Sequence, residues 1–157
     1  MEAMRLIEAT RSALTRSQTV QDIVAEAWQA QALAEVIGGY FAGSASPVTR
    51  WEAEGLSEAG GRACGALRRP ASGHTTLQWG GAIRASQLTE VRDPQRVLLA
   101  LGVLLGDVGI ALVEVACVAD EGLYWQCVEA VDAADESRDR VFGMLREFST
   151  HRAGGAA

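Results

Sequence analysis

VLLALGVLLGDVGIALVEVACVA, which runs from Val97 to Ala119, is the stretch that decides the fold. Its twenty-three residues include only two charged side chains, those of Asp107 and Glu114. A helix that crosses a membrane needs about twenty predominantly apolar residues, whereas the longest charge-free run here, Val97 to Gly106, has ten. Acids follow its carboxyl end, and neither flank carries an aromatic belt. We therefore predict the central helix of a soluble bundle and no membrane span.

Asp107 and Glu114 are seven residues apart, so they lie on nearly the same line of the helix, and Glu121 is seven residues further on. The favoured interpretation is a narrow solvated stripe on an otherwise buried helix. A second interpretation pairs the two acids with arginines of the first or third helix inside the bundle. In a third, the carboxyl groups line a pocket, where burial raises their pKa values and lets them hold a cation or act as acid and base.

Three glycines in the same stretch indicate a close neighbour. Gly102 and Gly106 have the GxxxG spacing, and Gly109 lies about one turn further along. Outside a membrane, small residues at this spacing favour the close approach of another helix within the bundle. The alternative is a seam between two copies of the chain. The sequence therefore leaves a homodimer open.

Amphipathic patterns predict four further helices around this one, over residues 2–14, 19–41, 47–67 and 123–148. Thr19 and Asp93 are the expected caps of the second and fourth helices, and Pro94 suits a first helical position. Four glycines weaken the third helix by about 1 kcal/mol each relative to alanine. The predicted core-facing side chains include those of Tyr40, Trp51 and Tyr124.

The remaining segments read as connections. Residues 68–94 contain Pro, Gly, Ser and Thr with little periodicity, which predicts a long surface loop. Residues 151–157 read as a disordered tail. We therefore predict a single all-α domain over residues 1–150, an antiparallel helical bundle of four main helices with a short N-terminal helix.

Charge and cysteine content exclude several classes of protein. The net charge is −6, and residues 93–136 carry nine acids against a single base, Arg96. Such a surface repels phosphate backbones and anionic lipids, so we expect no nucleic-acid partner. The three cysteines form no CxxC pair, and the N-terminus lacks the apolar core of a signal peptide. We expect a protein of the reducing cytoplasm, in which Cys117 and Cys127 are inert residues within apolar helices.

Catalytic and metal-binding motifs are not found. Both histidines, His74 and His151, lack the acid three residues earlier that a di-metal carboxylate bundle requires. HExxH, GxGxxG, P-loop and EF-hand patterns are absent. GLSEA, which begins at Gly55, lacks the second glycine of a nucleophile elbow. We therefore predict no catalytic residue, no metal site and no cofactor.

Tryptophans and an acidic run are the remaining candidates for binding. We expect Trp28, Trp51 and Trp125 to lie in or at the edge of the core, whereas Trp79, in the long loop, could plug a pocket or anchor a partner. Acids on the fifth helix are expected to form a solvated face, and a docking surface for a basic partner is the alternative. These acids are Glu129, Asp132, Asp135, Glu136 and Asp139.

A resemblance to a known family is carried by the segments DIVAEAWQAQALAE, GLSEAGGRACG, LTEVRDPQRVLLALGVLLGDVGIALVEVAC and EGLYWQCVEAVDAADESRDRV. In them the chain resembles an uncharacterised family of small alanine-rich actinobacterial proteins, a domain of unknown function. The resemblance covers nearly the whole chain except the loop at residues 70–83 and the tail. It implies a bacterial, single-domain, cytosolic protein, and it implies no site residue.

The sequence favours a non-enzymatic helical interaction or regulatory module with protein partners, because catalytic motifs are missing and apolar and acidic helix faces are plentiful. The alternative is a small-molecule-binding bundle or enzyme in which Asp107 and Glu114 line a cavity. Trp79 and Trp125 are the further ligand-binding candidates of that alternative.

Overall fold

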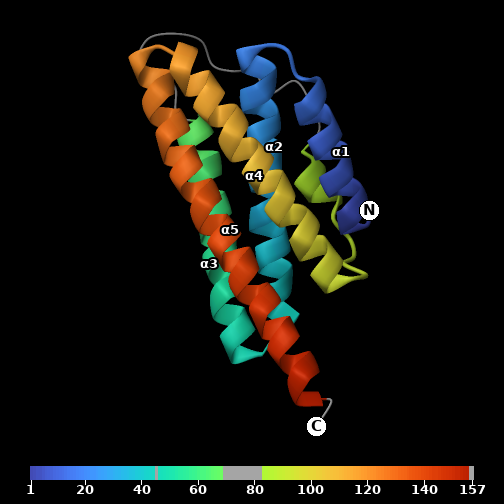
Figure 1. Ribbon diagram of the computed structural model, residues 1–157. Helices are drawn as coiled ribbons and strands as arrows, with labels where there is room; N and C mark the ends of the chain where they lie inside the picture. Colours follow the sequence, from blue (N-terminus) through green and yellow to red (C-terminus); the bar gives the residue numbers. More distant parts are fainter. Residues whose placement is uncertain (45, 69–82, 156–157) are drawn as a thin grey trace.

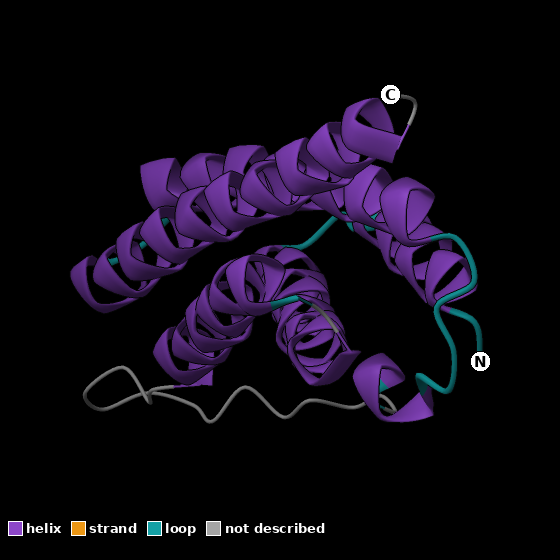
Figure 2. Cartoon of the chain, turned by 90° about the horizontal axis from the view of Figure 1, so that it is seen from below, coloured by secondary structure: helices purple, strands orange, loops and turns teal. Residues whose placement is uncertain are grey.

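The computed structural model describes residues 1–44, 46–68 and 83–155, and within them the chain is all-α (Figure 1, Figure 2). The elements, in chain order, are α1 (Ala3–Arg16), α2 (Val20–Ser44), α3 (Pro47–Arg68), the 3-10 helix η1 (Arg84–Gln87), α4 (Pro94–Val118) and α5 (Glu121–Gly155). The four long helices pack as a bundle, and α1 lies against α2 and α4. The predicted fold class, a bundle of four main helices with a short N-terminal helix, is confirmed.

Local capping explains where three of the helices begin. The backbone N–H of Asp22 donates to Thr19 Oγ1 at 3.1 Å, and that of Arg96 donates to Asp93 Oδ1 at 3.2 Å, with Pro94 in the first turn of α4. The N–H of Leu123 donates to Asp120 Oδ1 at 2.9 Å, which caps α5. Each bond satisfies a backbone donor that has no partner within its helix. Thr19 and Asp93 are the caps that the sequence predicts.

The core consists of aliphatic side chains from all five α-helices. Its largest fully buried members are Leu6, Ile7, Leu33, Ile37, Leu56, Leu67, Leu98, Leu101, Leu104, Leu105, Leu112 and Met144. α4 supplies five of these twelve side chains, which agrees with its predicted central place. It contacts α5, α2 and α1, and it lies in front of α2, between α5 and α1, in Figure 1.

Glycines bring the backbones of α2 and α3 together. A Cβ added at Gly60 would lie 2.6 Å from the backbone N of Glu35, and one added at Gly38 would lie 2.6 Å from the backbone N of Ser57. Real Cβ atoms do not approach backbone this closely, so only glycine fits at these two positions. Gly60 is one of the glycines expected to weaken the third helix. Gly60 lowers the helix propensity of α3, and the same residue allows the close contact between α3 and α2.

An ion pair occupies the contact between α3 and α5. Arg140 Nη1 lies 3.3 Å from Glu52 Oε2, and both side chains are about three-quarters buried. A Cβ at Gly55 would lie 2.5 Å from Arg140 Nε, and one at Gly143 would lie 2.8 Å from Glu52 Cδ. The two glycines therefore leave the room in which this ion pair lies between the helices.

Two predicted segments differ from the structure. The fifth helix does not end near residue 148 but continues to Gly155, so residues 151–155 are helical where a disordered tail was predicted. Arg152 in the last turn favours the extension, because a cation stabilises the carboxyl end of a helix. Within the predicted loop at residues 68–94, the part from residue 83 on packs against the bundle: the Arg84 N–H donates to Gln29 Oε1 at 3.0 Å.

Several aromatic side chains predicted to face the core are exposed. Trp28 is 5% exposed, as expected, but Trp51 is 67%, Trp125 is 57%, Tyr40 is 43% and Tyr124 is 42% exposed. α3 buries the face that carries its alanines and leucines, which is rotated away from Trp51. The Trp51 ring instead lies beside the Arg140 guanidinium, 5.8 Å from the ring centroid.

Candidate functional site

Apolar side chains are exposed along the outer face of α4. Leu99 is 56%, Val103 is 48%, Ile110 is 65% and Val113 is 50% exposed, and Cys117 is exposed as well. Together with Gly106 they recur at alternating intervals of four and three residues, and we call this set (Leu99, Val103, Gly106, Ile110, Val113 and Cys117) the outer stripe. Alternation of four and three places residues on one line of a helix. The outer stripe therefore runs for about 27 Å, at 1.5 Å per residue.

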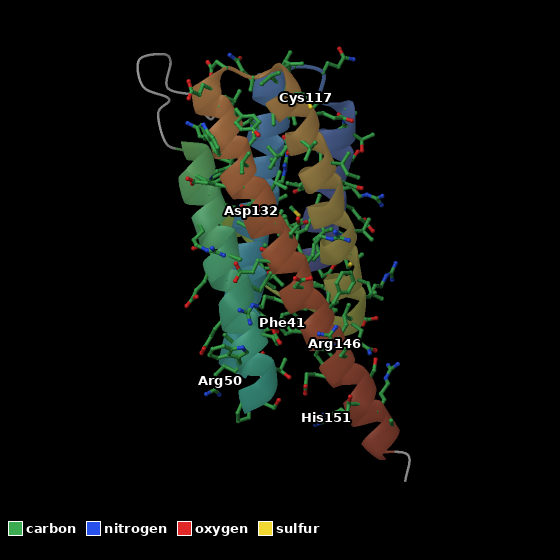
Figure 3. All side chains as sticks on the ribbon, turned by 60° about the vertical axis from the view of Figure 1, so that its left-hand side comes forward. Phe41, Arg50, Cys117, Asp132, Arg146 and His151 are labelled. Carbon is green, nitrogen blue, oxygen red and sulfur yellow. The ribbon has the colours of Figure 1, made fainter. Side chains whose placement is uncertain are left out.

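Asp107 and Glu114 are solvent-accessible, as the predicted solvated stripe requires, but α4 is not otherwise buried, because its solvated face is mainly apolar. α4 is apolar on both its inner and its outer face, so hydrophobic periodicity could not show which residues turn outward. The 4–3 spacing did not distinguish the faces either, because it runs from Leu101 to Val115 on the buried face as well as from Leu99 to Cys117 on the exposed one. No described helix crosses over this face in the view of Figure 1, and Figure 3 labels Cys117 near the end of α4 that meets α5.

Asp107 and Glu114 flank the outer stripe on the side of α1. Asp107 Oδ2 accepts a hydrogen bond from Arg11 Nε at 2.8 Å, and the two side chains are 39% and 54% exposed. Glu114 is exposed. The predicted pairing with an arginine of the first helix is thus found for Asp107, but at the surface rather than inside the bundle. Ligand binding at these two carboxylates stays a prediction.

The other two predicted ligand-binding residues lie apart from these acids. Trp125 is in the first turns of α5, where its ring meets that of Tyr124 edge-on with 5.2 Å between centroids. Trp79 lies outside the described residues. The structure therefore places Asp107 and Glu114 on one face of α4 and Trp125 beyond the α4–α5 turn.

Of the three glycines of α4, Gly106 belongs to the outer stripe, and Gly102 and Gly109, seven residues apart, lie on one flank of it. Positions for a Cβ at Gly102 and Gly106 are each 3.5 Å from an α5 side chain, that of Val141 and that of Arg138 respectively. At Gly109 no heavy atom lies within 4 Å of such a position. The predicted close backbone approach of a neighbouring helix is therefore not found: Gly102 and Gly106 make ordinary van der Waals contacts with side chains of α5, and Gly109 is left open.

Charges are distributed unevenly along the outer face of α4. Arg92 and Arg96 are exposed at its amino end, whereas Glu114, Asp120 and Glu121 are exposed toward its carboxyl end. A hydrogen bond from Arg92 to Glu90, 3.0 Å long, and the charge of that carboxylate raise the pKa of Arg92 above its ordinary value. The face is positive at one end, apolar in the middle and negative at the other end.

α4 also meets the length and composition of a membrane span. Its most apolar window of 18 residues has a mean hydropathy of 2.2, and 44% of that window is buried inside the structure. The core helix of a soluble protein meets the same criterion. The low buried share follows from the exposed outer stripe.

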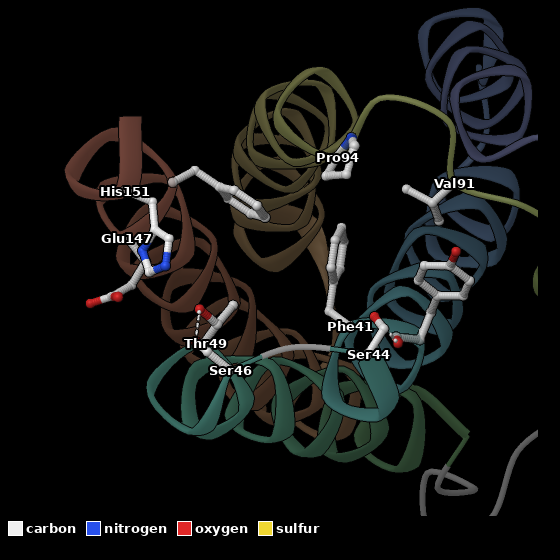
Figure 4. Close-up of a pocket in the computed structure, with 10 residues that line it drawn as sticks. Phe41, Ser44, Ser46, Thr49, Val91, Pro94, Glu147 and His151 are labelled. Atoms are coloured by element: carbon white, nitrogen blue, oxygen red, sulfur yellow. Dashed lines mark hydrogen bonds between the residues drawn. The ribbon is translucent and has the colours of Figure 1, made fainter. Parts of the chain in front are cut away.

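A cavity of about 360 Å³ lies at the end of the bundle where α2 ends and α3 and α4 begin (Figure 4). Phe41, Phe148, Val91 and Pro94 line its apolar part. Its rim carries Ser44, Ser46, Thr49, Glu147 and His151. The hydroxyls of the rim have partners already: Ser46 and Thr49 hydrogen-bond each other at 3.1 Å, and Ser44 donates to the carbonyl of Tyr40 at 3.1 Å. Neither Asp107 nor Glu114 lines this cavity.

The cysteines differ in their surroundings. Cys127 is fully buried, and burial raises the pKa of its thiol to about 11. Cys64 is buried and donates to the carbonyl of Trp28 at 3.7 Å. Cys117 is exposed on the outer stripe, within the apolar helix α4, and its expected inertness stays a prediction. In the part of the chain that the structure describes, no group of three or more His, Cys, Asp or Glu side chains could hold a metal ion.

The comparisons with known proteins define the family. The model of a family of unknown function, DUF6099, matches residues 1–147, so the chain belongs to that family. No curated protein and no solved structure matches the chain. The resemblance to a domain of unknown function, drawn from the sequence, is confirmed.

Proposed function

We propose that the protein is a non-enzymatic interaction module that docks an amphipathic α-helix along the outer stripe of α4. The observation that carries the proposal is the line of exposed apolar side chains from Leu99 to Cys117. Single exposed hydrophobic residues are ordinary on protein surfaces, whereas a contiguous line of them is typical of an interaction surface.

Burial of the outer stripe by a partner is favourable in free energy. Burying an aliphatic side chain of this size contributes about 1.5–3 kcal/mol. Leu99, Val103, Ile110 and Val113 each have about half or more of their surface exposed, so a partner could recover a large part of that contribution at four positions. A straight line of apolar side chains with 4–3 spacing fits another helix better than a loop or a strand, because helices pack side chains at the same spacing.

The charges around the stripe restrict the partner further. A docked helix would meet Arg92 and Arg96 at one end and Glu114 and Asp120 at the other. It should therefore carry acids near the first pair and bases near the second. The net charge of −6 argues against an anionic membrane surface as the occupant.

The outer stripe is preferred over the cavity beside Phe41 as the site of function. The hydroxyls of that cavity's rim already bond to each other or to the backbone, and its apolar part includes rings that pack on each other, Phe41 and Phe148 at 6.4 Å between centroids. The polar side chains that remain to orient a ligand there are those of Tyr40, Glu147 and His151.

Site-specific photocrosslinking in cells of the natural host tests the proposal. A photoreactive amino acid at Val103 should give a discrete protein adduct, and Ile110→Glu in the same chain should abolish that adduct. The matched control places the same photoreactive group at Asp132, which is exposed on α5. Equal adducts from both positions, or an adduct that survives Ile110→Glu, would rule out docking on the outer stripe.

A further inference from the structure

We propose that the helix docked on the outer stripe is α4 of a second copy of this chain, packed antiparallel about a twofold axis. This inference rests on the proposed function and names its partner. Three features of α4 carry it: the symmetry of the stripe, the fit of the exposed Ile110 side chain, and the polarity of the charges.

The spacing of the outer stripe is the same in both directions. From Leu99 to Cys117 the intervals are four, three, four, three and four residues. An antiparallel copy centred at residue 108 therefore places every stripe residue opposite another stripe residue. Leu99 faces Cys117 of the second copy, Val103 faces Val113, and Gly106 faces Ile110. A twofold interface requires this self-complementarity of one surface.

The pairing of Gly106 with Ile110 complements shape. Ile110 is the most exposed residue of the stripe, at 65%. Gly106 has no side chain, and at neighbouring Gly109 the space for a Cβ is open. In the antiparallel register each isoleucine lies over Gly106 of the other copy and beside the open space at Gly109, while Arg138, whose Nε is 3.5 Å from a Cβ position at Gly106, borders the contact on the side of α5. The arrangement occurs twice, once on each side of the axis.

The charges favour the antiparallel direction over the parallel one. In the antiparallel register, Arg96 lies level with Asp120 of the second copy, so opposite charges meet at both ends of the contact. A parallel pair would place Arg96 beside Arg96 and Glu114 beside Glu114, which is repulsive. Near the axis, Arg11 and Asp107 form an ion pair in each copy, so neither pair presents a net charge to the other.

Flanking helices extend the contact beyond α4. Phe142 of α5, 41% exposed, lies beside Gly102, with a ring carbon 3.9 Å from the position of a Cβ there. On the opposite flank, Arg11 of α1 pairs with Asp107. Specific dimers bury about 800 Å² on each partner, so side chains from α1 and α5 should take part together with the stripe.

Disulfide trapping tests the register with a thiol that the chain already has. Under a mild oxidant, Leu99→Cys should form a disulfide with Cys117 of the second copy and give a covalent dimer. Neither the double variant Leu99→Cys, Cys117→Ser nor the wild type should form a covalent dimer. Val36→Cys provides the matched control, since Val36 is an exposed apolar residue of α2, 39% exposed. Wild-type dimers linked through Cys117 itself would overturn the antiparallel register.

Sedimentation over a range of protein concentrations tests the dimer without added cysteines. Ile110→Glu should raise the dissociation constant by about a hundredfold or more, with Val103→Glu as a second variant and Val36→Glu as the control that leaves it unchanged. Circular dichroism shows whether each variant is folded. A wild-type chain that stays monomeric overturns this inference, while a host-cell adduct of another mass at Val103 would still support the proposed function. Absence of any stripe-specific adduct would overturn both.

Discussion

Two regions of the molecule differ in how they use small and apolar residues. One is the contact between α2 and α3, and the other is the outer stripe of α4. At the first, Gly38 and Gly60 let two backbones meet, and a single added Cβ would lie 2.6 Å from a backbone nitrogen. At the second, Leu99 and Ile110 project from a helix that has open space at Gly109. One surface is closed within the chain, and the other is left open.

This difference separates stability from association. Where the packing of the chain is complete, a change of one methyl group is costly because interiors are densely packed. Where apolar side chains face outward, the same change has little effect on the isolated chain. We therefore expect substitutions in the first region to lower the free energy of unfolding and substitutions in the second to change binding.

The largest expected effect on stability is that of Gly60→Ala. The added methyl group meets the backbone of Glu35 and the carbonyl oxygen of Gln31, 2.8 Å away, and neither can move without shifting a helix. We expect a loss of about 3 kcal/mol in the free energy of unfolding, measured by urea denaturation. Gly65→Ala is the matched control in the same helix, with open space around it, and it should stabilise the protein by up to about 1 kcal/mol. Equal effects would mean that the two backbones are not in contact.

The next effect concerns the other side of α2, where Glu26 holds η1. Arg84 Nη2 lies 3.1 Å from Glu26 Oε1, a second bond joins the same groups, and both side chains are mostly buried. Glu26→Gln should cost about 2 kcal/mol, because it leaves a largely buried guanidinium without its counter-charge. Arg62 and Glu136 form the comparison, since that pair is much more exposed. Glu136→Gln should therefore lower the free energy of unfolding by less than Glu26→Gln does. Equal losses from the two variants would show that burial does not determine the strength of these ion pairs.

A pH effect on stability is expected from the buried thiol of Cys127. Burial raises the pKa of the Cys127 thiol from 9.0 to about 11, so the folded chain holds this proton more tightly than the unfolded chain. The resulting stabilisation is complete below pH 9 and is lost as the pH rises from 9 toward 11. The stability difference between the wild type and Cys127→Ala should therefore narrow across that range in denaturant titrations. A constant difference would show that the thiol does not titrate in this way.

The smallest effect is expected at Asp107. Its bond to Arg11 is well exposed on both sides, and exposed ion pairs contribute about 0–1 kcal/mol. Asp107→Asn should therefore leave the melting temperature, measured by calorimetry, nearly unchanged. The small change that it does cause should become smaller still at high salt. A rise in stability of several kcal/mol would instead indicate a carboxylate strained in a pocket, which is the sequence-based alternative for Asp107 and Glu114.

Much of the architecture could be predicted because it depends on neighbours in the chain. Thr19, Asp93 and Pro94 mark the starts of helices by local hydrogen bonding and fixed backbone geometry, and the structure has those helices. The extent of the apolar run from Val97 identified the helix that supplies the most large core residues. The candidate site was less predictable, since charge distinguishes Asp107 and Glu114 in the sequence, whereas the apolar residues of the outer stripe form most of the exposed surface.

The sequence by itself determined that the chain is all-α, approximately where each helix begins, and that α4 is central to the bundle. Capping and a repeat of 3.6 residues are local properties, so they can be read along the chain. Only the tertiary structure decided which side of α4 is covered, and which glycines touch another backbone. A helix that is apolar all round can be rotated about its axis without changing its pattern, and only the packing of α1, α2 and α5 selects the face that remains exposed.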